Sequence, residues 1–79
     1  MPSGITIVNG DTVQHFYTAS DQVSGGVAFS GNVDPGASSA PFSLAAGSDG
    51  TGSVIVTPAG LVGQSFFGVQ DSQVLTMNQ

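Results

Sequence analysis

The chain contains no lysine, arginine, glutamate or cysteine among its 79 residues. Its only side chains with a formal charge at neutral pH are five aspartates: Asp11, Asp21, Asp34, Asp49 and Asp71. Without a cationic side chain the protein cannot clamp a phosphate with Lys or Arg, or form a Schiff base on lysine. Without cysteine it can form neither a disulfide nor a thiolate metal site.

The length predicts one domain spanning residues 1–79, with a marginal core. A domain of this size buries only about 60–65 % of its unfolded surface. Small domains compensate with disulfides, metals or assembly, and here cysteine is absent and histidine is single. The sequence therefore predicts no cofactor, and either a homo-oligomer, a trimer among the options, or a subunit held by a larger protein assembly.

The net charge of −5 excludes whole classes of partner. Nucleic-acid binding depends on cations that neutralise phosphate, and anionic membranes attract basic segments. We therefore expect neither nucleic acid nor a membrane as a partner. No apolar run reaches the roughly 18 residues of a membrane span. The first residues, Met1 to Gly4, carry no basic region typical of a signal peptide, so we expect synthesis in the cytosol without export.

Short β-branched runs, separated by 12 glycines and 4 prolines, indicate an all-β protein. No helical periodicity extends over ten or more residues, and period-2 alternation argues against disorder. The fold class we predict is a small antiparallel β-sandwich or barrel of about six or seven short strands. The expected strands span residues 5–8, 12–18, 26–33, 41–46, 53–58, 64–69 and 73–77.

Two connections have clear turn chemistry. Asn9-Gly10 tolerates the positive φ angles of a type I′ turn, which predicts a hairpin between residues 5–8 and 12–18. The glycine-rich segment 47–52 predicts a hairpin connection between residues 41–46 and 53–58. Two expected strands lie at the termini, where unpaired edges without lysine favour pairing with another chain.

Candidate catalytic and metal sites have ordinary structural explanations. His15 is the only side chain that titrates near neutrality, as a general base must. The chain has no G-x-S-x-G motif, however, which would supply a nucleophilic serine for it to activate. We expect a packed or surface histidine, with a pH-sensitive contact at an oligomer axis as the alternative. Asp49, beside Ser48 and Thr51, is one carboxylate, too few for a dedicated calcium site unless others converge. The aspartates near Gly, Pro or Ser fit turn roles. No catalytic, cofactor-binding or metal residue is predicted.

Aromatic side chains mark the expected interface. Phe66-Phe67 directs one ring to each face of a strand, so one ring fills the core and the other needs a neighbour or a covering loop. Phe16 and Tyr17 pose the same question in the first hairpin. We therefore predict Phe16, Tyr17, Phe66 and Phe67 as interface residues.

Residues 25–31 (GGVAFSG) and 48–57 (SDGTGSVIVT) resemble pieces of bacterial and phage Ig-like domains, which often place a D-G-x-G turn before a Val/Thr strand. The chain as a whole also resembles the small decoration, or cement, proteins of tailed-phage virions, which are short, cysteine-free and β-rich. That resemblance implies binding at symmetry axes of a capsid, as trimers or monomers, and stabilising the shell against internal pressure.

The predicted function is that of a non-enzymatic virion protein that decorates a capsid, located on the virion surface after synthesis in the host cytoplasm. The alternative is an Ig-like or fibre-type module that binds a cell-surface receptor or glycan through Tyr17 and exposed Phe residues. A small hydrolase using His15 is the third hypothesis. The absence of Lys and Arg also leaves no trypsin cleavage site, which suits an exposed particle component.

Overall fold

The computed structural model describes residues 1–78, and within that range the chain forms six strands and no helix. The all-β prediction is confirmed. The strands are β1 (Thr6–Asn9), β2 (His15–Asp21), β3 (Val27–Val33), β4 (Gly52–Pro58), β5 (Gln64–Val69) and β6 (Val74–Met77). No helix long and apolar enough to cross a membrane occurs in this described part of the chain.

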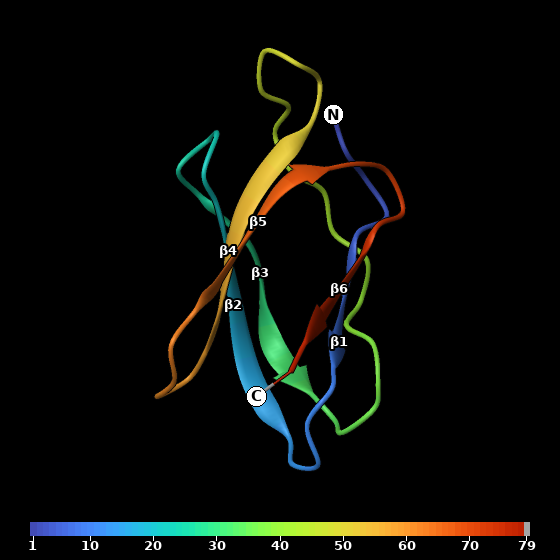
Figure 1. The fold of residues 1–79 in the computed structure, drawn as a ribbon, viewed down its shortest axis with the longest axis vertical. Helices are drawn as coiled ribbons and strands as arrows, with labels where there is room; N and C mark the ends of the chain where they lie inside the picture. The colour runs from blue at the N-terminus through green and yellow to red at the C-terminus, as the bar shows by residue number, and fades with distance from the viewer. Residues whose placement is uncertain (79) are drawn as a thin grey trace.

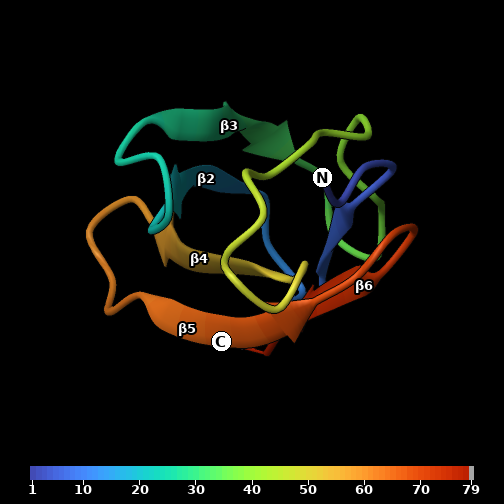
Figure 2. The ribbon, with the colours of Figure 1, turned by 90° about the horizontal axis from the view of Figure 1, so that it is seen from above.

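The strands form two sheets that face each other (Figures 1 and 2). The larger sheet is antiparallel and four-stranded, in the order β3-β2-β4-β5, and the smaller is the parallel pair β1-β6. The sheets do not close into a barrel, so that alternative is wrong. The antiparallel prediction holds for the larger sheet only.

The predicted hairpin at Asn9-Gly10 is wrong. β1 pairs in parallel with β6, in the register Thr6↔Val74 to Asn9↔Met77, and β2 lies in the other sheet. The residues between β1 and β2 therefore cross from one sheet to the other. The N-terminal strand is also not a free edge, because residues 37–42 run along its other side.

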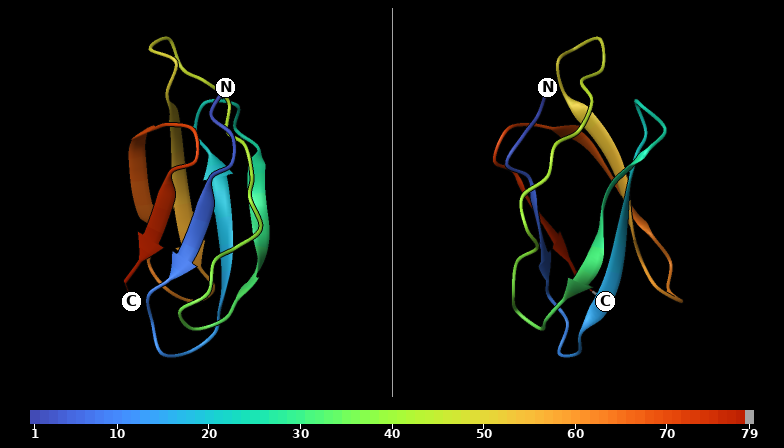
Figure 3. Two further views of the ribbon diagram at one scale, coloured as in Figure 1. Left: turned by 90° about the vertical axis from the view of Figure 1, so that its right-hand side faces the viewer. Right: turned by 180° about the vertical axis from the view of Figure 1, so that it is seen from behind.

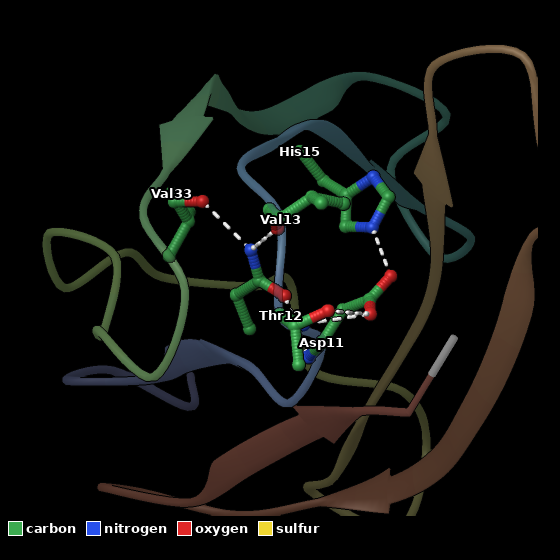
Figure 4. A network of polar contacts seen from close by, with 6 residues as sticks. Asp11, Thr12, Val13, His15 and Val33 are labelled. Atoms are coloured by element: carbon green, nitrogen blue, oxygen red, sulfur yellow. Dashed lines mark hydrogen bonds and ion pairs between the residues drawn. The ribbon is translucent and has the colours of Figure 1, made fainter.

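The reason is the side chain of Asn9, which is fully buried. Its amide nitrogen donates to the carbonyl oxygens of Val13 and Val33, each at 2.8 Å (Figure 4). Its amide oxygen accepts a hydrogen bond from the backbone N–H of Asp11 at 2.9 Å. Asn9 thus holds the crossing segment against the end of β3, a tertiary role that its turn propensity does not reveal.

The predicted strand 41–46 and the hairpin after it are also corrected. This segment is extended but belongs beside β1, where Ile5 and Phe42 exchange backbone hydrogen bonds of 3.0 and 2.9 Å. β4 instead pairs with β2 and β5. The turn that follows is closed by a hydrogen bond from Gly47 N–H to the Thr51 carbonyl, and it carries the chain from the smaller sheet to the larger (Figure 3).

The core lies between the two sheets and takes residues from both. The smaller sheet contributes Ile7 of β1 and, just before that strand, Ile5. The larger sheet contributes Tyr17, Val54 and Val56, and all five side chains are fully buried. Ala28 is an extra residue in the β2–β3 pairing, and this bulge turns Val27 outward, away from Phe29 and the core.

Candidate interaction surface

The larger sheet has one face toward the core and one toward solvent. On β2, buried Tyr17 and Ala19 alternate with the outward Phe16, Thr18 and Ser20. The register of the neighbouring strands then fixes which of their side chains share the outward side. We call this set the outer face: Phe16, Thr18, Ser20, Val27, Ser30, Asn32, Ser53, Ile55, Thr57, Ser65 and Phe67.

A β-bulge presents Phe67 on this outer face. Val54 lies opposite Phe66 and Gly52 opposite Val69, so Phe67 and Gly68 together face the single residue Ser53. Gly68 has φ +66°, a left-handed conformation that glycine adopts without a steric penalty. The bulge lets Phe66 and Val69 both point inward while Phe67 stands 76 % exposed. The prediction that the two rings point to opposite faces is confirmed.

The four residues predicted as an interface do not lie together. Phe16, at 43 % exposure, and Phe67 are on the outer face. Tyr17 is fully buried in the core, and Phe66 is partly buried and packed against it. Tyr17 is therefore unavailable to a partner, because the residue that alternates outward on β2 is its neighbour Phe16.

Two apolar residues of the outer face were missed. Ile55 could be placed there from the sequence, since it alternates with the inward Val54 and Val56 on β4. Val27 had no such signal, because only the bulge at Ala28 moves it outward. With Phe16 and Phe67 they make four apolar side chains among hydroxyl and amide groups.

The outer face carries no charge, because the aspartates occupy the two ends of the molecule. The turns that contain Asp11 and Asp34 lie at the lower end in Figure 1, and those with Asp49 and Asp71 lie at the upper end. Asp21 closes the upper end of β2 and points inward. The outward residues of β1 and β6, namely Thr6, Val8, Val74 and Thr76, are also uncharged. All negative charge therefore lies away from both sheet faces.

Asp21 is a buried carboxylate, 5 % exposed, in a chain that has no lysine or arginine to pair with it. Backbone N–H groups take that role. Its Oδ1 accepts from Val23 at 2.9 Å and Ser24 at 3.2 Å, and its Oδ2 accepts from Ala45 at 2.7 Å. Burial alone would raise the pKa of Asp21, but these donors outweigh it and lower the pKa below its ordinary value. The carboxylate ties the β2–β3 turn to the segment beside β1.

His15 forms the one side-chain ion pair that the described residues contain. Its Nε2 lies 2.7 Å from Oδ2 of Asp11, and the two carry opposite charges when the imidazole is protonated (Figure 4). The histidine contact, followed by the Thr12 N–H, lowers the pKa of Asp11. The imidazole also lies 5.7 Å from the Tyr17 ring, whose hydroxyl makes no hydrogen bond to another atom of residues 1–78. No serine hydroxyl contacts His15, so the hydrolase hypothesis gains no support.

The lowered pKa values predict acid sensitivity. The pKa values of Asp11, Asp21 and Asp49 are all lowered from their ordinary value in the folded protein, so the unfolded chain binds more protons in acid. The stability that these carboxylates contribute is present above pH 4. It is lost as pH falls through the pKa values that they have in the folded protein. Urea unfolding between pH 5 and pH 2 should show a falling free energy, with a shallower fall for Asp21→Asn. A flat profile in both proteins would contradict this reading.

Two open hollows lie at the upper end of the molecule. One, of about 300 Å³, is lined by Asp49, Thr51, Gln70 and Asp71 among others, and the second, of about 330 Å³, adjoins Asp21 and Ala45. Neither is lined by an aromatic residue. Asp49 is engaged by the N–H and hydroxyl of Thr51 in its own turn. Within residues 1–78, no group of three His, Cys, Asp or Glu side chains is placed to hold a metal ion.

Comparison with protein-family models, with curated proteins and with solved structures finds no match for this chain.

Proposed function

We propose that this protein is a non-enzymatic structural component of a protein assembly, and that it packs against neighbours through its uncharged sheet faces. A virion shell, which it would decorate and stabilise, is the assembly that the resemblance to decoration proteins implies. In that role the protein acts by burying apolar and hydroxyl-bearing surface between subunits rather than by chemistry on a substrate.

The single observation that carries the proposal is the separation of charge from the faces. A lone acidic protein gains solubility from charge spread over its surface, because net charge opposes self-association. Here the charge is confined to turns and to one buried site, while Phe16 and Phe67 stand on a face without any charge. Exposed aromatic residues among polar neighbours are typical of surfaces that contact other proteins.

The alternative, a receptor- or glycan-binding module, is less well supported. It requires a groove lined by Tyr17 and other aromatic side chains. Tyr17 lies in the core, and the two hollows at the upper end lack aromatic lining residues.

The test is the location of the protein in purified particles. Particles from a phage-producing culture that expresses the chain are isolated on a density gradient and digested with a protease that cuts at aspartate, since trypsin has no site. We expect its peptides in the particle fraction, at a fixed ratio to the major shell protein after repeated purification. Peptides confined to the soluble fraction would overturn the virion role.

A further inference from the structure

We propose that the outer face of the larger sheet binds a second copy of this chain about a two-fold axis, with Phe16 of each copy packed against Phe67 of the other. The inference rests on the proposed function and deepens it, because it names the partner at one of the two uncharged faces.

Charge selects a second copy as the occupant. Each copy carries a net charge of −5 and no lysine or arginine, so most contacts between two copies bring like charges together. The outer face is an exception, because its eleven residues include none of the aspartates. A basic partner would find no carboxylate there to pair with. An uncharged face therefore matches another uncharged face, and the same face on a second copy is always present in solution.

The position of the two phenylalanines suits two-fold packing. Phe16 lies on β2 at the lower end of the sheet, beside Ala59, and Phe67 lies on β5 at the upper end, opposite Ser53. From strand spacing and rise, they are separated by about 20 Å along the strands and about 10 Å across them. They thus lie diagonally across the face, Phe16 on an interior strand and Phe67 on an edge strand. A two-fold axis that lies in the plane of the interface and crosses the midpoint of this diagonal at right angles places each Phe16 over the other copy's Phe67, so one operation makes both aromatic contacts.

The residues between the two rings permit close approach. Thr18, Ser20 and Thr57 occupy the middle of the face with Ile55, and they are smaller than the two rings. The smaller sheet offers a poorer alternative, since its outward side chains at Thr6, Val8, Val74 and Thr76 include no aromatic ring. Packing by the larger sheet therefore buries the two most exposed rings, while the smaller sheet stays free for a further partner.

The size of the face predicts a weak dimer. Three strands of seven residues and one of six present about 430 Å² per copy, or about 860 Å² for two copies. Stable complexes usually bury about 1,200 to 2,000 Å² in total. Packed sheets lie about 10 Å apart, close to one Debye length at physiological ionic strength, so salt screens the repulsion between the aspartates at the ends of packed copies. We therefore expect reversible association in the micromolar range or weaker, which added salt does not weaken.

Sedimentation velocity over a concentration series tests this interface. The wild-type chain should convert from monomer to dimer, and Phe16→Thr or Phe67→Thr should each raise the dissociation constant by about tenfold or more, as for an aromatic residue that carries much of the binding energy of an interface. Threonine keeps the β propensity, and amide NMR spectra verify that each variant is folded. Val74→Thr, which removes an exposed apolar side chain from the smaller sheet, is the matched control and should leave the constant unchanged.

A charge exchange tests the pairing itself. Phe16→Asp and Phe67→Lys should each abolish the dimer at physiological salt. The double variant should associate more tightly than either single variant, because the carboxylate at position 16 of each copy then faces the ammonium at position 67 of the other. Val74→Lys controls for the added cation. Association of the double variant that is no tighter than that of either single variant would overturn the pairing.

A wild-type protein that stays monomeric at every concentration, an equal effect of Val74→Thr, or a trimer at saturation would each overturn the two-fold interface. None of these outcomes bears on the particle experiment, which tests the structural role separately. A monomer that is found in particles would show that only the self-association is wrong.

Discussion

The Asn9→Asp variant should lose about 3 kcal/mol of stability or more, because a buried group left without its hydrogen bonds costs about 1–3 kcal/mol each. The substitution keeps the shape of the side chain but replaces its NH₂ group by an oxygen. That oxygen would then face the carbonyl oxygens of Val13 and Val33, which Asn9 now satisfies at 2.8 Å each. Two hydrogen bonds become two repulsive contacts in a fully buried position.

Urea denaturation followed by circular dichroism at pH 7 measures the free energy of unfolding of the wild-type chain and of Asn9→Asp. Asn78→Asp is the control, since it adds the same charge at an exposed position just beyond β6, whose last residue pairs with Asn9. It should change stability by less than about 0.5 kcal/mol. A domain of this size has about 5 kcal/mol in total, so Asn9→Asp should be close to unfolding at ambient temperature. Equal stabilities of the two variants would contradict the role given to Asn9.

Asn9 is needed as a hydrogen-bond donor, whereas Asp21 is needed as an acceptor. The Asp21→Ala variant should also lose about 3 kcal/mol of stability, since hydrogen bonds to a charged acceptor contribute about 1.5–3 kcal/mol each. Alanine removes the acceptor of three backbone donors at once. The N–H of Ala45 is the most affected, because its 2.7 Å bond joins two segments 24 residues apart. The N–H groups of Val23 and Ser24 lie in an exposed turn, where water can accept the hydrogen bonds that the carboxylate no longer accepts.

Asp34→Ala is the matched control for Asp21. Asp34 is exposed, and its carboxylate accepts a hydrogen bond from the side chain of Gln14. Its removal should change the unfolding free energy by less than about 1 kcal/mol. Hydrogen exchange adds a local readout. In Asp21→Ala the Ala45 amide should lose protection, whereas amides in the middle of β4 should follow the global change only. Retained protection at Ala45 would show that the carboxylate is not what holds this segment.

Local pattern predicted the strands better than their partners. The period-2 alternation in residues 26–33, 53–58, 64–69 and 73–77 located four strands to within about two residues. It could not predict that β1 pairs with β6, since that parallel contact joins the two ends of the chain and no local turn specifies it. The Asn9-Gly10 dipeptide misled because the Asn side chain accepts the Asp11 N–H in a local turn and also donates to the carbonyls of Val13 and Val33, and so it holds the chain as it crosses to the other sheet.

The candidate surface was predictable only in part, because local alternation gives the relative direction of neighbouring side chains but not the partners of a strand. Alternation alone showed that Phe66 and Phe67 point to opposite sides, but it could not show which side is the core until the second sheet was placed. Tyr17 was predicted as an interface residue because, in a strand with one exposed face, the sequence does not show whether Phe16 or Tyr17 points outward. The charge-free face was not foreseen, since it depends on strand order in space, which places Phe16 and Phe67 on one sheet.

Isotope-filtered NMR on a mixture of labelled and unlabelled chains tests most directly whether the outer face joins two copies. The nuclear Overhauser effects recorded arise only between protons on different molecules. We predict contacts between the Phe16 ring of one copy and the Phe67 ring of the other in concentrated protein, fading on dilution. Intermolecular contacts that instead involve Val74 and Thr76, or none in the most concentrated sample, would contradict the account.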